Sequence, residues 1–192
     1  MHNFSEYLSK QNIVATAFDN YKEINDLINS ILNLAADQNS LVFTIGNGGS
    51  ASTAEHFSAD LTQSQVRTGM PIRSFCLNSQ VAASSAFAND FEYSKVLEKQ
   101  LSQFKNSNYI LVAFTASGNS ENILNAVTMA VKDNKEVYCF VGFDGGKVRE
   151  ISGTKLLNFP DPNSNYGIAE NLHLTAAHYV VESLIYKMKN LS

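Results

Sequence analysis

Five short apolar runs alternate with segments of helical periodicity, and this alternation constrains the fold more than any other feature of the chain. The runs lie at residues 41–46, 72–77, 109–114, 136–142 and 155–159, and helical patterns lie near 12–36, 50–65, 91–104, 120–132 and 168–189. Strands that are apolar on both faces and alternate with helices form parallel sheets that are covered on both sides. The pattern therefore predicts a three-layer α/β/α sandwich with a five-stranded parallel sheet, of the flavodoxin or Rossmann-like kind.

The length of the chain and its N-terminal pattern predict the domain organisation. A chain of 192 residues has the size of one ordinary domain. From about Asn12 to Ala36 the apolar positions recur mostly at three- and four-residue spacing, which is typical of one long amphipathic helix. We therefore expect residues 1–192 to form a single domain, with an N-terminal helical segment, 1–38, that packs on its own sheet or between subunits.

Composition excludes several classes of function. The net charge of −4 and the 44% hydrophobic content are typical of a globular protein, so we expect no direct binding of nucleic acid. Cys76 and Cys139 lie in apolar runs, which predicts buried thiols and a reducing cytoplasm. No run approaches the ~18 apolar residues of a membrane span, and the N-terminus lacks the pattern of a signal peptide. We expect a cytoplasmic protein without membrane contact.

Two loops of similar composition follow the first and third apolar runs. In GNGGS, residues 46–50, the glycines allow close backbone approach, and Ser50 is a candidate helix N-cap. In TASGNS, Thr115, Ser117 and Ser120 lie next to a helix start, whose free N–H groups favour an anion. Each loop alone is also explained as an ordinary turn. Together, at the carboxyl edge of one parallel sheet, they predict a phosphate site.

A nucleotide cofactor is the alternative explanation of the first loop, because GNGGSA matches the dinucleotide pattern G-x-G-x-x-A. That pattern needs an acidic residue about 20 positions further on, after the next strand. Asn78 and Ser79 follow that strand here, and no G-K-[ST] of a Walker A loop occurs. The sequence therefore favours the phosphate of a small metabolite.

Candidate acid, base and metal ligands lie on two helical segments. His56 and Asp60 are four residues apart and share a helix face, which fits either a surface hydrogen bond or a ligand pair. The last helix offers Glu170, His178 and, as a local alternative ligand, His173. Glu170 and His178 are eight residues apart, or roughly 12 Å of helix rise. To bind one ion they require a bent helix or a neighbouring subunit.

The motifs GNGGSASTAEHFSADL, FANDFEYS, TASGNSENI, GFDGGKV and AENLHLTAAH together resemble the sugar isomerase (SIS) domain, and most closely its phosphoheptose isomerase branch. The resemblance runs in order from about Ile31 to Leu184. It implies a homotetramer that interconverts sedoheptulose 7-phosphate and D-glycero-D-manno-heptose 7-phosphate, for bacterial lipopolysaccharide heptose biosynthesis. It also implies active sites at subunit contacts and one Zn²⁺ per subunit near the reacting carbons.

The resemblance assigns roles position by position. Asp60 and His178 match the family's catalytic residues, and the metal set becomes His56, Asp60, Glu170 and His178. Residues that the resemblance places around the sugar phosphate are Asn47, Gly48, Gly49, Ser50, Asn89, Asp90, Thr115, Ala116, Ser117, Ser120 and Glu170.

The chain also departs from the family pattern. Asp60 stands where the family has Glu, Glu170 where it has Gln, and Ala116 where it has a hydroxyl residue. An arginine of the family is Ser64 here, with Arg67 three residues later. These departures leave three alternatives: an isomerase of a different sugar phosphate, a sugar-phosphate-binding regulator without catalysis, or a replication-initiation factor that binds DnaA. The four metal-competent side chains favour an isomerase.

Overall fold

A computed structural model of the chain describes residues 3–37 and 39–191, so that His2 and position 38 of the expected N-terminal segment lie outside the described residues. Within these ranges, five strands form one parallel sheet in the order β2-β1-β3-β4-β5. The sheet predicted from the sequence is confirmed. Its strands are β1 (Leu41–Ile45), β2 (Ser74–Cys76), β3 (Tyr109–Thr115), β4 (Glu136–Gly142) and β5 (Thr154–Phe159). The order reverses between β1 and β3, where open sheets of this kind bind ligands.

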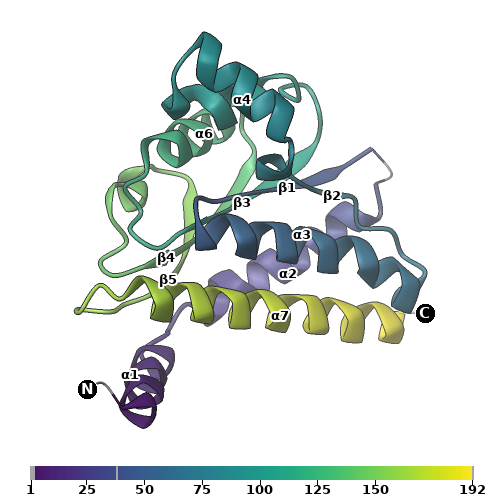
Figure 1. Cartoon of the computed structure of the whole chain (residues 1–192). Helices are drawn as coiled ribbons and strands as arrows, with labels where there is room; N and C mark the ends of the chain where they lie inside the picture. Colours follow the sequence, from purple (N-terminus) through teal and green to yellow (C-terminus); the bar gives the residue numbers. More distant parts are fainter. Residues whose placement is uncertain (1–2, 38, 192) are drawn as a thin grey trace.

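Helices cover both faces of the sheet, as Figure 1 shows, and confirm the three layers. One face is covered by α2 (Tyr21–Ala35), α3 (Gly49–Thr68) and α7 (Tyr166–Leu191). The other face carries α5 (Val96–Ser102) and α6 (Glu121–Lys132), with α4 (Val81–Asp90) further out. None of the described helices is both long enough and apolar enough to cross a membrane.

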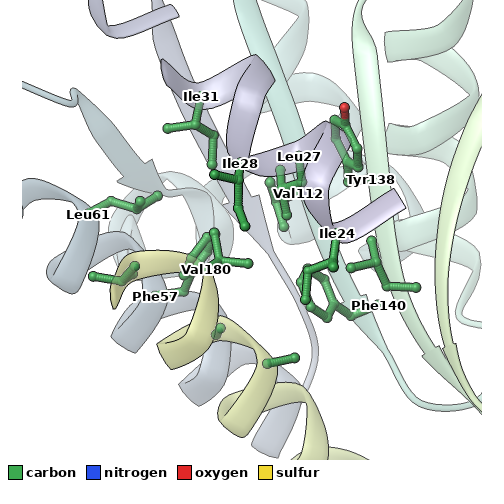
Figure 2. Packing of buried hydrophobic residues seen from close by; sticks show 14 of the residues in the cluster. Ile24, Leu27, Ile28, Ile31, Phe57, Leu61, Val112, Tyr138, Phe140 and Val180 are labelled. Atoms are coloured by element: carbon green, nitrogen blue, oxygen red, sulfur yellow. The ribbon is translucent and has the colours of Figure 1, made fainter. Parts of the chain in front are cut away.

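The apolar strands divide their side chains between two cores. In β3, Ile110 and Val112 face the α2, α3 and α7 side, whereas Leu111 and Ala113 face the α5 and α6 side. This alternation follows from the two-residue period of a strand, and it explains why the successive positions 109–114 of β3 are all apolar. Figure 2 shows the first core, in which Ile24, Leu27, Ile28 and Ile31 of α2 lie over β3 and β4 beside Phe57 of α3 and Val180 of α7.

The prediction of one helix from Asn12 to Ala36 was wrong. The chain forms two helices, α1 (Phe4–Thr16) and α2, which are separated at residues 17–20. Two contacts with β5 fix the segment between the two helices. The ring of Phe18 stacks on that of Phe159 with a centroid distance of 4.7 Å, and the Asn20 Oδ1 accepts a hydrogen bond of 2.8 Å from the backbone N–H of Asn158. These contacts are tertiary, so helical periodicity gives no sign of them.

Two local expectations were also wrong. The helix expected at 91–104 is instead a 3₁₀ turn, Tyr93–Lys95, followed by α5. The preceding helix, α4, was not predicted from the sequence. Ser50 is not the N-cap of α3, because the helix begins at Gly49 and the capping position is Gly48, with a positive φ of 53°. Only the glycine adopts this backbone angle without strain. The prediction of free, buried thiols at Cys76 and Cys139 is confirmed.

Candidate functional site

Packing of α7 against α3 brings three candidate ligands together (Figure 1). The Nε2 atoms of His56 and His178 lie 3.2 Å apart. The Oδ2 of Asp60 lies 3.3 Å from the Nε2 of His56 and 3.8 Å from that of His178. Both imidazoles are half exposed, and the carboxylate is less exposed. The helical pair predicted from spacing is therefore completed by a histidine from another helix.

The geometry of this group fits a tetrahedral zinc ion. Two nitrogen ligands at 2.0–2.1 Å from a tetrahedral ion lie roughly 3.3 Å apart, and the Nε2 atoms of His56 and His178 are 3.2 Å apart. All the ligand atoms of His56, Asp60 and His178 lie within 4.8 Å of one another. Two histidines and one carboxylate are a known catalytic zinc set, which leaves a fourth position for water or substrate. This group can hold a metal and can also move protons.

Glu170, expected as a fourth ligand, lies elsewhere. It is not part of the three-residue group found among the described residues. Its carboxylate lies directly against Gly49 at the start of α3, where a Cβ atom on residue 49 would come 2.2 Å from the Oε2 of Glu170. Because His56 follows Gly49 by seven residues, about 10 Å of helix rise separates the two places along α3.

The two loops predicted from the sequence form one cavity of about 240 Å³ at the carboxyl edge of β1 and β3. The first loop and α3 contribute Asn47, Gly48 and Ser50. The second loop contributes Thr115, Ala116, Ser117 and Ser120, and Phe114, Tyr166 and Glu170 complete the lining. Hydroxyl groups and the N-terminus of α3 favour an anion here, whereas the carboxylate of Glu170 already lies beside Gly49 at that N-terminus.

A second cavity of about 260 Å³ adjoins the histidine pair. Asp60, Ser64 and Arg67 line it from one face of α3, because residues three and four apart lie on the same side of a helix. His178 and Glu182 line it from α7. Arg67, three residues after the position where the family has arginine, therefore places a positive charge at the wall of this cavity.

Asn89 and Asp90 do not meet the other candidate residues in this chain. They are exposed at the end of α4, where the Asn89 side chain donates a hydrogen bond of 3.1 Å to Asp90, and they line neither cavity described above. Their expected contact with the substrate remains a prediction.

His173, the alternative ligand, is a core residue. It is fully buried beside the rings of Phe114, Phe140 and Phe159, at centroid distances of 5.6–6.2 Å. Neither ring nitrogen has a hydrogen-bond partner among the described residues. Burial of the ring lowers the pKa of His173 to about 4. The backbone of Val141 raises this pKa, but its effect is smaller than that of burial. The ring is therefore neutral at pH 7 and lies away from the three-residue group.

Three residues of the site were not predicted as site residues from the sequence: Asn122 and Tyr166, which had no assigned role, and Tyr93, which was interpreted as a core or subunit-contact residue. Tyr166 lines the hydroxyl-lined cavity between the two loops, and the other two bind the side chain of Asn47. Asn122 had a detectable signal, because it shares the buried face of α6 with Ala126 and Ala130 at four-residue spacing. A polar residue on an apolar helix face indicates a buried hydrogen-bond partner.

Comparison with known proteins identifies the family of the chain. A family model described as SIS domain matches residues 6–142. A phosphoheptose isomerase of Neisseria meningitidis (strain FAM18) is 32% identical over 145 residues, which cover 74% of this chain and 73% of the relative.

Solved structures of phosphoheptose isomerases have a similar fold. The structure of a phosphoheptose isomerase from Francisella tularensis is similar with a TM-score of 0.82 and 25% identity, over 95% of this chain and 93% of the other. That of a phosphoheptose isomerase from Neisseria gonorrhoeae has a TM-score of 0.81 and 24% identity, over 94% of each chain, and supports the fold alone. The family model, which covers more than half of the chain, shows that the chain belongs to the SIS domain family.

Proposed function

We propose that this chain is an aldose–ketose isomerase that converts sedoheptulose 7-phosphate into D-glycero-D-manno-heptose 7-phosphate. The observation that carries the proposal is the group His56, Asp60 and His178, which lies two helical turns from a hydroxyl-lined anion cavity. The names of the relatives support the same reaction class and substrate. A regulator that only binds sugar phosphates has no need of an acid–base group beside the cavity.

The reaction needs a proton to move between two neighbouring carbons. The phosphate lies in the loop cavity, where Thr115, Ser117 and Ser120 donate hydrogen bonds and fix the position of the sugar. Asp60 removes the proton on the carbon next to the carbonyl, and the electron pair moves onto the carbonyl oxygen to give an enediolate. His178 transfers a proton between the two oxygens, and the carbon proton returns to the adjacent carbon. No external oxidant or reductant is required.

His56, Asp60 and His178 would hold a Zn²⁺ ion, one in each subunit. A zinc ion there supplies a Lewis acid that polarises the carbonyl and stabilises negative charge on oxygen. Glu170, the fourth ligand expected from the sequence, reaches this group only after a rearrangement or from a second subunit. In the described chain it acts at the phosphate end of the site.

We also propose that the enzyme is a homotetramer of the cytoplasm that supplies heptose for lipopolysaccharide. The half-exposed histidine pair and large exposed apolar side chains support burial between subunits. These side chains are Phe4 and Leu8 on α1, Val66 on α3, and Tyr179 and Tyr186 on α7. The two free cysteines support a reducing compartment.

The test is turnover of sedoheptulose 7-phosphate in heavy water by protein stripped of metal, with and without added zinc. We expect zinc-dependent formation of the aldose with deuterium at C2, measured by proton NMR. A folded protein that binds the sugar phosphate but shows neither turnover nor exchange would contradict the isomerase. That outcome favours a non-catalytic regulator, a DnaA-binding factor or a different sugar.

A further inference from the structure

Three polar side chains from separate segments form a closed set of hydrogen bonds beside the anion cavity. The Oδ1 of Asn47 accepts hydrogen bonds of 2.9 Å from the Tyr93 hydroxyl and of 2.9 Å from the Nδ2 of Asn122. In return, the Nδ2 of Asn47 donates a hydrogen bond of 2.8 Å to the Oδ1 of Asn122. We call Asn47, Tyr93 and Asn122 the amide clamp.

The clamp is anchored on α6. Asn122 is only 3% exposed and lies in the first turn of this helix, among buried apolar neighbours. One helical turn later, the Nδ2 of Asn125 donates a hydrogen bond of 2.9 Å to the backbone carbonyl of Ser94, next to Tyr93. One helix therefore holds both the loop after β1 and the connection between α4 and α5.

The contacts of Asn47 leave its side chain little capacity for a ligand. Its carbonyl oxygen already accepts two hydrogen bonds, and one of its two amide hydrogens is donated to Asn122. A single N–H remains for a substrate. The sequence resemblance assigned Asn47 to substrate contact, whereas these bonds fit a residue that holds the loop in place.

The loop needs such a restraint because it is rich in glycine. Gly48 has a positive φ of 53°, and Gly46, Gly48 and Gly49 surround Asn47. Glycine has greater backbone freedom than any other residue, and an unrestrained loop loses that freedom when a ligand binds. A loop that is fixed before binding avoids this loss.

We propose that the amide clamp positions the backbone of residues 46–50 to receive the sugar phosphate, with Tyr93 and Asn122 as positioning residues. This inference rests on the proposed function. The clamp acts at the phosphate cavity and not at His56, Asp60 and His178, so its loss weakens substrate binding more than the chemical step. The proposal also predicts that the effects of replacing Tyr93 and Asn122 on substrate binding are not additive.

The test uses the full-length variants Tyr93→Phe and Asn122→Ala, with Tyr21→Phe as the matched control. Tyr21 is an exposed tyrosine whose ring contacts Phe18 and which does not line the cavity. Tyr93→Phe removes one hydrogen bond of the clamp and Asn122→Ala removes two. We expect Tyr93→Phe to raise KM for sedoheptulose 7-phosphate by about five- to tenfold, the effect of one lost hydrogen bond, and Asn122→Ala to raise it at least as much. We expect kcat to stay within about twofold and the control to match the wild type.

The double variant separates positioning from a general loss of structure. Because both residues restrain the same loop, Tyr93→Phe should add less than about twofold in the Asn122→Ala background. A purely structural role would lower the melting temperature and the fraction of active protein without a selective rise in KM. If Asn122→Ala does not fold, Tyr93→Phe alone still gives the answer, because it removes only a surface hydroxyl.

Failure of this inference is distinguishable from failure of the proposed function. If the wild type shows no turnover, the isomerase is wrong, and calorimetric binding of the sugar phosphate to the same variants still tests the clamp. Wild-type KM and wild-type affinity in the folded variant Tyr93→Phe would overturn the inference. A five- to tenfold loss of affinity in that variant, with the control unchanged, would support it.

Discussion

The imidazoles of His56 and His178 meet with their Nε2 atoms 3.2 Å apart, although 122 positions separate the two residues in the chain. Each lies on a different helix, and only the packing of α3 on α7 brings them together. Two imidazole nitrogens at this distance form either a single hydrogen bond or a metal chelate.

Zinc should stabilise the folded protein through both histidines. At a free zinc concentration of 100 times its Kd, the free energy of unfolding should rise by about 2.7 kcal/mol. His178→Ala should weaken zinc binding by roughly 100-fold or more, since even the partners of metal ligands contribute 10- to 100-fold. Urea unfolding with and without zinc measures the first value, and competition with a coloured chelator measures the second. Tyr179→Phe is the neighbouring control, and equal zinc affinity in the two variants would refute the chelate.

Replacing Glu170 should affect the phosphate and not the metal. Its carboxylate lies in the hydroxyl-lined cavity, beside Gly49, where it repels a second anion. Glu170→Gln should therefore leave zinc affinity within about twofold and tighten the binding of inorganic phosphate several-fold, because a neutral amide removes the repulsion. Calorimetry gives both affinities. A large loss of zinc affinity would instead place Glu170 among the ligands in solution.

Asp60 should be needed for the chemical step. Asp60→Asn keeps the shape of the side chain but removes the base, so kcat should fall by about 10²- to 10⁴-fold. Phosphate affinity should stay unchanged, because Asp60 does not line the phosphate cavity. The matched control is Asp26→Asn, which removes an exposed carboxylate from an ion pair with Lys22 on α2. Activity of Asp60→Asn close to the wild type would exclude Asp60 as the base.

Stability should fall in weak acid because of His173. Its folded pKa of about 4 is below the ordinary histidine value of 6.5, so the unfolded chain binds more protons between these two values. The contribution is complete above pH 6.5 and is lost as the pH falls towards 4, with about 2 kcal/mol lost by pH 5. Urea unfolding of the wild type and of His173→Leu at pH 7.5 and pH 5 measures the difference. An identical pH dependence in both proteins would contradict the neutral buried ring.

Gly118, in the loop between Ser117 and Ser120, should tolerate no side chain. It has a positive φ of 63°, and an added Cβ would come 2.1 Å from the carbonyl oxygen of Gly145. Gly69 has a positive φ of 72° but no neighbour within 4 Å of such a Cβ. Gly69→Ala should therefore cost only the backbone strain, about 1–2 kcal/mol. Gly118→Ala should cost more in chemical denaturation and should weaken sugar-phosphate binding; equal costs would exclude the clash.

Local sequence patterns determined the strands, the helices α3, α6 and α7, and the two loops. A strand buried on both faces needs mostly apolar residues, and an amphipathic helix needs apolar residues at three- and four-residue spacing. Both patterns can therefore be recognised in the sequence. The pairing of His56 with Asp60 was predictable for the same reason, because four residues make one helical turn. The resemblance to a known family added His178 to this pair.

Tertiary structure decided what depends on contacts between distant segments. It broke the N-terminal helix at residues 17–20 through Phe159 and Asn158, and it placed Glu170 at the N-terminal end of α3. It also joined Asn47 to Asn122 and brought His178 onto His56. A sequence pattern records which face of an element is apolar, but the packing of whole elements sets which polar side chains meet. The strands and helices are therefore local properties of this chain, and its site is a property of the complete fold.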